Sequence, residues 1–116
     1  MPGPAASRVG DAIATGHWCD TVSKIAGPGN IRVLIGGKPA AVVGDLSDPH
    51  THGVPPICIS HTVPITTGYE RVLVGSKSIA MVGSLIDSGA VTGGADRVFV
   101  SNPENVVPVV PETDEV

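Results

Sequence analysis

Hydrophobic and polar positions repeat along this chain in a unit of fourteen residues. The unit reads RVLIGGKPAAVVGD from Arg32 to Asp45 and RVLVGSKSIAMVGS from Arg71 to Ser84. In each copy an apolar run ends at two turn-forming residues, Gly36-Gly37 or Gly75-Ser76, and a second run returns to Val-Gly. Two short strands separated by two such residues are typical of a β-hairpin with a primed turn. The pattern therefore predicts two copies of one hairpin.

Partial copies of the unit stand near both ends of the chain. Ser7–His17 (SRVGDAIATGH) matches the end of the unit, and Asp96–Val100 (DRVFV) matches its beginning. Taken cyclically, the chain holds three units that align at Gly10, Gly44 and Gly83. Regular repetition favours a pseudo-threefold all-β object. A duplicated hairpin in an ordinary sandwich is the alternative.

Each Val-Gly is followed by a polar loop and then by a short apolar segment. These segments are Val22–Ala26, Val63–Thr67 and Ala90–Thr92. We expect one domain over residues 1–101 and a Pro-rich, acidic C-terminal tail over residues 102–116.

Composition supports short strands and tight turns. The chain has 15 glycines and 11 prolines but only three aromatic residues, Trp18, Tyr69 and Phe99. Glycine and proline interrupt helices, whereas β-branched residues fit pleated surfaces. A net charge of -4 argues against nucleic acid or an anionic membrane as partner. No signal peptide and no long apolar run is visible, so synthesis in the cytoplasm without secretory export is expected.

Potential metal ligands are confined to two loops. All four histidines and both cysteines fall within Gly16–Asp20 (GHWCD) and Asp48–His61 (DPHTHGVPPICISH), and the third loop, Gly83–Gly94, has neither residue type. Imidazole and thiolate are the ligands of tetrahedral zinc and of similar iron sites, and closed four-ligand sites are usually structural. The two cysteines, Cys19 and Cys58, could instead pair with each other.

No catalytic constellation stands out in the sequence. There is no phosphate-binding Gly-Lys-Ser or Gly-Lys-Thr, and the serines lack an obvious partner base. Four aspartates, Asp11, Asp20, Asp45 and Asp48, could be taken as paired carboxylates. Aspartate directly after Val-Gly is more simply a turn former. We therefore expect no enzymatic activity.

The motifs resemble those of the PAAR-repeat proteins. The segment GGKPAAVVGD keeps Pro39-Ala40-Ala41 intact, with Val42 in the position of the family's arginine, and SRVGDAIATGH resembles the family's opening. The similarity covers about residues 7 to 100. It implies a small conical fold of three β-hairpin repeats with pseudo-threefold symmetry.

The resemblance also implies a function. Such proteins sit, one per trimer, on the blunt end of a homotrimeric β-helical spike and sharpen it. These spikes belong to contractile injection machines, namely phage tail baseplates, type VI secretion systems and related particles, whose tips make transient contact with the target cell membrane. No toxin domain accompanies the repeats in these 116 residues, so a tip of the phage-baseplate type is expected.

The family's metal, zinc or iron, is held near the vertex by three histidines and one cysteine. Carried over by position, the implied ligands are His17, His50, Cys58 and His61. The family's third-loop Cys-Gly-Gly reads Ser88-Gly89-Ala90 here, so the thiolate must come from Cys58 or Cys19. The additional His52 could replace His50.

The end opposite the histidine loops is expected to form the base that meets the spike. Its strands would be Arg32–Ile35, Arg71–Val74 and Arg97–Val100. The small aliphatic residues expected to line it, some of them also belonging to the core, are Val33, Ile35, Val72, Val74, Val98 and Val100. Two other functions stay open: a metal-dependent hydrolase with an open zinc position, and a free-standing metal-binding module.

Overall fold

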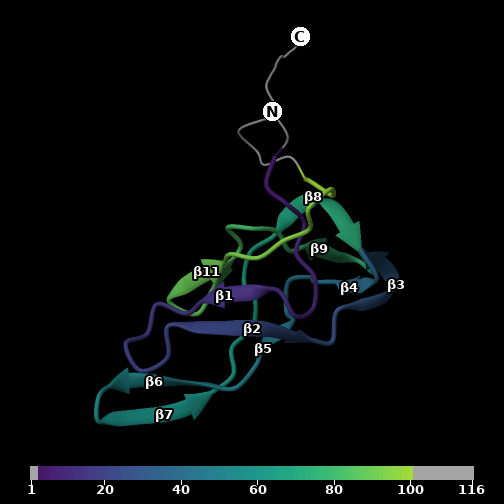
Figure 1. The fold of residues 1–116 in the computed structure, drawn as a ribbon. Coiled ribbons are helices and arrows are strands. Elements are labelled where there is room, and N and C mark those ends of the chain that lie inside the picture. The colour runs from purple at the N-terminus through teal and green to yellow at the C-terminus, as the bar shows by residue number, and fades with distance from the viewer. Residues whose placement is uncertain (1–2, 101–116) are drawn as a thin grey trace.

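The structure is a computed structural model and describes residues 3–100 (Figure 1). This part of the chain is all-β, and none of its segments is a helix that could cross a bilayer. Its strands are β1 (Ala12–Ala14), β2 (Val22–Gly27), β3 (Asn30–Ile35), β4 (Lys38–Ala40), β5 (Leu46–Ser47), β6 (His50–Val54), β7 (Ile57–His61), β8 (Tyr69–Val74), β9 (Lys77–Ile79), β10 (Leu85–Ile86) and β11 (Gly89–Val91). The expected tail, 102–116, lies outside the described residues, so the domain boundary remains a prediction.

The two full copies of the repeat form the expected hairpins. Strand β3 pairs with β4, and β8 pairs with β9. Both central residues of each turn have positive φ: 60° and 81° at Gly36 and Gly37, and 59° and 69° at Gly75 and Ser76. Positive φ at both positions defines a type I′ turn, whose twist matches that of the flanking strands. The predicted primed turn is confirmed.

The third hairpin is assembled from the two ends of the chain. Ala5 forms an antiparallel bridge with Phe99. The N–H of Ala6 donates to the carbonyl of Val98 at 2.9 Å, and the N–H of Val100 donates to that of Pro4 at 2.8 Å. The cyclic arrangement predicted from the partial copies is therefore confirmed.

A ring of three backbone hydrogen bonds marks the pseudo-threefold axis. The N–H of Ser7 donates to the carbonyl of Ala80 (3.0 Å), that of Ala80 to Ala41 (2.9 Å), and that of Ala41 to Ser7 (3.0 Å). All three side chains are fully buried. Only small residues allow three backbones to approach one axis this closely, which explains the small residue at this position of every repeat.

A small barrel surrounds the part of this axis that lies toward hairpin β6–β7 (Figure 1). Strands β10, β11, β1, β2 and β5 form one sheet in that order. Bridges from Leu46 to Pro64 and from Ile65 to Ile86 join its two edges. The predicted apolar segment at residues 63–67 thus contributes bridges rather than a full strand. Five large aliphatic side chains fill the barrel: Ile13, Ile25, Ile65, Ile86 and Val91.

The residue after each Val-Gly closes a turn. It accepts a hydrogen bond from the N–H three positions earlier: Arg8 to Asp11 Oδ2 (2.7 Å), Val42 to Asp45 Oδ2 (2.8 Å) and Met81 to Ser84 Oγ (3.0 Å). The interpretation of these aspartates as turn formers is confirmed. Arg8, which holds the position of the family's arginine in the first repeat, also pairs its guanidinium with Asp11 at 3.0 Å.

The expected base residues divide between core and surface. Ile35, Val74 and Val100 are buried in a second core cluster, which lies between the three hairpins, whereas Val33 and Val98 are exposed. Ile35, Val74 and Val100 are thus the members of the set that belong to the core, as was expected of some of them. The large apolar side chains that face outward are their sequence neighbours, Leu34, Leu73 and Phe99, one from each repeat.

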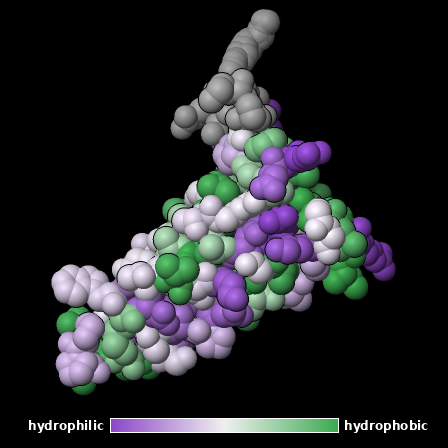
Figure 2. Space-filling model, viewed as in Figure 1, coloured by the Kyte–Doolittle hydropathy of each residue, from purple (hydrophilic) through white to green (hydrophobic). Residues whose placement is uncertain are grey.

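The described part is elongated, with principal-axis extents of 55 × 29 × 24 Å. Hairpin β6–β7 projects at one end, and the hairpins β3–β4 and β8–β9 lie toward the other (Figure 1). Figure 2 shows hydrophobic residues beside strongly hydrophilic ones toward the β3–β4 end, whereas the β6–β7 end is mostly pale with a few hydrophobic residues. Exposed large hydrophobic side chains nevertheless occur at both ends, among them Leu34 and Leu73 at one and Val54, Ile57 and Ile59 at the other.

Candidate metal centre

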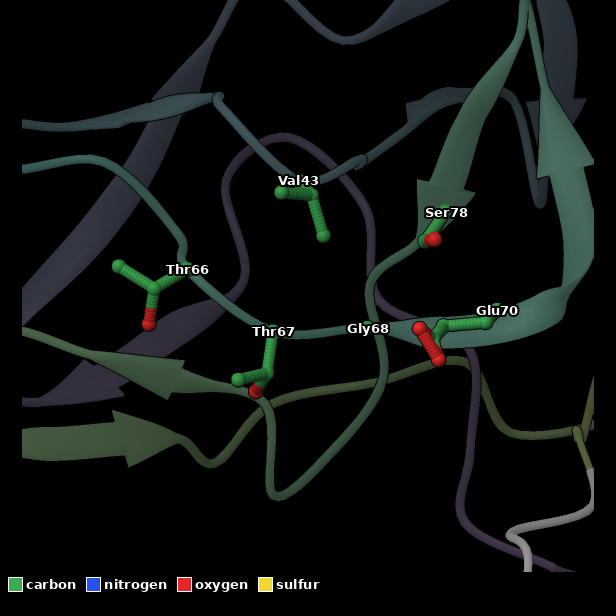
Figure 3. A pocket seen from close by; sticks show the side chains of 6 residues that line it. All are labelled: Val43, Thr66, Thr67, Gly68, Glu70 and Ser78. Atoms are coloured by element: carbon green, nitrogen blue, oxygen red, sulfur yellow. The ribbon is translucent and has the colours of Figure 1, made fainter.

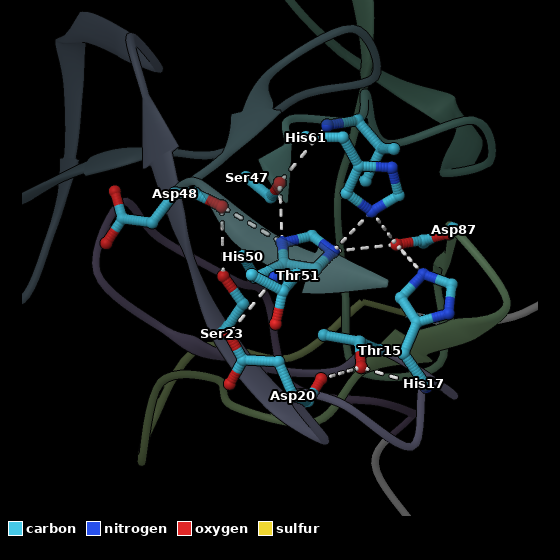
Figure 4. A network of polar contacts seen from close by, with 11 residues as sticks. Thr15, His17, Asp20, Ser23, Ser47, Asp48, His50, Thr51, His61 and Asp87 are labelled. Carbon is cyan, nitrogen blue, oxygen red and sulfur yellow. Dashed lines mark hydrogen bonds and ion pairs between the residues drawn. The ribbon is translucent and has the colours of Figure 1, made fainter. Parts of the chain in front are cut away.

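Four side chains from three loops converge at the root of hairpin β6–β7 (Figure 4). Asp87 Oδ2 lies 2.7 Å from Nε2 of His17, 2.7 Å from Nε2 of His50 and 3.1 Å from Nε2 of His61. One potential ligand atom from each residue lies within 4.8 Å of the other three. The three histidines expected from the sequence are thus brought together, and a carboxylate takes the fourth position.

The first loop carries His17 and packs closely on the third loop, which carries Asp87. Gly16 has a φ of 79°, and a Cβ atom there would lie 2.5 Å from the carbonyl oxygen of Ser88. Only glycine permits this approach. The hydroxyl of Thr15 accepts the N–H of His17 at 3.1 Å, which fixes the backbone where the imidazole turns toward Asp87.

The second loop supplies two histidines through strand register. His50 of β6 pairs directly with His61 of β7. Directly opposed residues of an antiparallel pair place their side chains on the same face. The rings therefore meet edge to face, with centroids 4.5 Å apart.

Neighbouring polar groups set the tautomer of His50. Its Nδ1 lies 3.0 Å from the carbonyl oxygen of Asp48 and 3.4 Å from Oγ of Ser47. A carbonyl oxygen only accepts, so Nδ1 donates to Asp48, and Nε2 is the ring nitrogen that faces Asp87. Ser47 occupies the barrel position held by Ile13 and Ile86 in the other repeats, so this repeat exchanges an apolar side chain for one that supports His50.

Asp87 was not among the residues singled out from the sequence. The third loop contains neither histidine nor cysteine, and carboxylates elsewhere in the repeat act as turn formers. A signal was nevertheless present, because Asp87 is the one charged residue between Gly83 and Gly94, in the loop equivalent to the two histidine loops. Its φ of 58° is unusual for a residue with a side chain.

Cys58 does not join the group in this structure, and the thiolate ligand stays a prediction. Its sulfur is bonded to that of Cys19. Side chains alternate along a strand, so Cys58 and His61, three residues apart, lie on opposite faces of β7. The disulfide instead ties the first loop to hairpin β6–β7. His52 also stays outside the four-residue group, with its ring stacked on that of His61 at 4.0 Å.

The surroundings of His61 and Asp87 favour the protonation states in which these two side chains bind metals. Burial and the neighbouring His52 lower the pKa of His61, although Asp87 opposes this shift. Burial alone would raise the pKa of Asp87, but hydrogen bonds with His50 and His17 outweigh it and lower that pKa. A neutral imidazole and an ionised carboxylate are the forms that bind metals.

The donor set fits a transition-metal ion. Nε2 of His61 and Nε2 of His50 face each other at 2.9 Å, and both also point at the Asp87 carboxylate. Three imidazole nitrogens and one carboxylate oxygen are common ligands of zinc and of divalent iron. The cluster is thus one that could bind a metal ion.

A surface pocket elsewhere offers far less chemistry (Figure 3). It is lined by Val43, Thr66, Thr67, Gly68, Glu70 and Ser78. Its side chains supply hydroxyls and a single carboxylate, that of Glu70. This set makes neither a metal site nor a nucleophile paired with a base.

Comparison with known proteins agrees with these observations. Residues 15–94 match the family described as PAAR motif, and this span includes all four residues of the metal cluster. None of the curated proteins compared with the chain matches it. The family match covers more than half of the 116 residues and includes both full copies of the repeat and the two histidine loops. The chain therefore belongs to the PAAR-motif family, whose members are associated with the spike tips of contractile injection machines.

Proposed function

We propose that the protein is the structural tip that caps the trimeric β-helical spike of a contractile injection machine and helps it to pierce the target cell envelope. The observation that carries this proposal is the ring of backbone hydrogen bonds joining Ser7, Ala41 and Ala80. Through it a single chain presents three equivalent hairpins around one axis. The expected location is the tip of a phage tail baseplate or of an equivalent particle.

Symmetry explains why a monomer would carry three similar repeats. A trimer with threefold symmetry ends in three equivalent surfaces. A single chain satisfies all three only if it repeats its own contact surface around the same axis. One tip would therefore bind three spike chains.

The base surface is apolar and rich in strands. We define it by the outward-facing Ile31, Leu34, Leu73, Val98 and Phe99, all of which are exposed. Exposed apolar clusters of this kind mark interaction sites. The free edges of two-stranded hairpins can also extend the strands of a partner by β-augmentation.

The metal cluster supports a structural role at the opposite end. His17, His50, His61 and Asp87 would hold one ion, zinc or iron, and join three loops that are distant in sequence. A closed structural zinc site contributes about 10 kcal/mol or more of apparent binding free energy. A narrow end has little apolar area to bury, so such a tie would contribute much of its stability.

The two other functions account for less of the molecule. A zinc hydrolase needs an open coordination position for water, whereas this cluster offers four protein ligands. A free-standing metal-binding module gives no reason for a third hairpin built from the two chain ends. PAAR-motif proteins are structural rather than enzymatic, which also favours a tip.

Charge substitutions at the base test the proposal directly. Leu34→Glu or Leu73→Glu should reduce binding to the cognate spike trimer by at least about 100-fold, because each places a carboxylate in an apolar contact. Ile59→Glu is the matched control, since Ile59 and Leu34 are both 60% exposed but lie on different hairpins. Spike binding that tolerates a charge at every base position would overturn the proposal.

A further inference from the structure

Hairpin β6–β7 and the adjoining first loop expose large apolar side chains at the end away from the base. Trp18 is 83% exposed, and Val54, Ile57 and Ile59 are also largely exposed. We call these four residues the apolar tip surface. Four such residues at one end of a small protein exceed the scattered apolar exposure that is normal for a soluble surface.

Strand register places three of the four on one face. Val54 pairs directly with Ile57, and Ile59 pairs with His52, so all of these side chains share the face that carries His50 and His61. The face thus begins at the metal cluster and becomes apolar toward the turn. The Cys19–Cys58 disulfide holds the loop that bears Trp18 beside β7.

The same hairpin carries no formal charge. Residues 49–69 contain no aspartate, glutamate, lysine or arginine, although the whole chain has 18 such residues. The aspartates that contact the hairpin do so at its root rather than near the turn: Asp20 accepts the N–H of Thr51 (3.2 Å), and Asp87 lies against His50 and His61. A protein partner usually offers charged and polar groups at the rim of its interface, which this hairpin would leave without charged partners.

We propose that the apolar tip surface enters the boundary between headgroups and acyl chains of an uncharged lipid bilayer. The inference rests on the proposed tip function and names the surface by which the tip would first engage a membrane. Indole rings favour this boundary because they combine an apolar body with one N–H donor, and aliphatic side chains gain by leaving water.

The structure also limits the depth of entry. Strands β6 and β7 pair only with each other among the described strands, so their outer edges keep backbone groups that water must satisfy. Unpaired backbone groups are costly in the hydrocarbon core. The hairpin therefore rests at the interface on its own, and driving it deeper requires force from the machine behind it.

The single tryptophan makes the contact measurable without a label. Trp18 is the only tryptophan in the chain, so the intrinsic emission reports this surface alone, even if the base also touches lipid. Titration with phosphatidylcholine vesicles should shift the emission to shorter wavelength. Phosphatidylcholine brominated near the headgroup should quench the emission more strongly than lipid brominated near the chain end. The shift should be insensitive to salt, because no charge contributes.

Matched variants assign the effect to the hairpin. Ile57→Asp or Val54→Asp should weaken vesicle partitioning at least about tenfold, because each adds a charge that must be dehydrated. Leu34→Asp, at the base, should leave the emission shift unchanged. Unchanged metal content and melting temperature would verify that each variant folds.

The result that would overturn the inference is a Trp18 emission that stays unshifted and unquenched at millimolar lipid, with the protein failing to float with vesicles. In that case the surface would fit a protein of the target cell instead. Neither outcome bears on spike binding, which is measured separately with the base variants.

Discussion

Asp87 Oδ2 lies 2.7 Å from Nε2 of His50, although 37 residues separate the two in the chain. The contact joins the second and third repeats at the narrow end of the molecule, and His17 brings in the first repeat. A metal ion held there would lie between all three repeats. The identity of the fourth ligand is therefore the sharpest question about this site.

Replacing the fourth ligand should separate the carboxylate from the thiolate. Asp87→Ala should lower zinc affinity at least about 100-fold, because loss of a direct ligand costs more than the 10–100-fold typical of its hydrogen-bond partners. Cys19→Ser/Cys58→Ser should keep one equivalent of metal per chain. Elemental analysis and competition with a chromophoric chelator measure both. Retention of metal by Asp87→Ala together with its loss from the double serine variant would restore Cys58 as the ligand.

Removing the metal should destabilise the fold. A ligand present at about 1,000 times its dissociation constant adds about 4 kcal/mol to the free energy of unfolding, and each kcal/mol shifts the melting temperature of such a domain by roughly 4–8 °C. Chelation with EDTA should thus lower the melting temperature by at least about 15 °C, and re-addition of zinc should restore it. His61→Ala should melt near the chelated wild type and respond little to either treatment. A melting temperature unaffected by EDTA would mean that no ion ties the loops together.

The sequence was most informative where structure is local or repeated. The adjacent Gly36 and Gly37 adopt positive φ without steric cost, so the local sequence alone predicted a primed turn. The partial repeats at the two ends predicted a third hairpin, which forms between Ala5 and Phe99. Confinement of all histidines to two loops pointed to the cluster that the fold assembles.

The features that the sequence did not predict depend on how loops pack and how strands pair. Asp87 becomes a partner of the histidines only because Gly16 lets the first loop lie against Ser88. Strict alternation would place Val33 on the buried face with Ile35. However, the register of β3 and β4 shifts between Asn30 and Leu34, and Val33 is left partly exposed. Such an irregularity follows from the pairing of strands rather than from the apolar pattern of one strand.

The turn residues after Val-Gly should contribute unequally to stability. Asp45 is buried and accepts two backbone N–H groups, from Val42 at 2.8 Å and from Gly29 at 3.1 Å. Asp45→Ala should cost about 3 kcal/mol, because it leaves both donors unpaired. Ser84, the equivalent residue of the third repeat, accepts only the N–H of Met81 among the described contacts, so Ser84→Ala should cost about 1 kcal/mol. Urea denaturation at fixed zinc measures both, and equal losses would refute the argument.

The central claim is that three repeats in one chain match a threefold spike. Native mass spectrometry of the protein mixed with its cognate spike measures this most directly. The account predicts a complex of one tip chain with three spike chains that does not change when the tip is in excess. A complex of three tip chains with three spike chains, or no complex between folded partners, would contradict it.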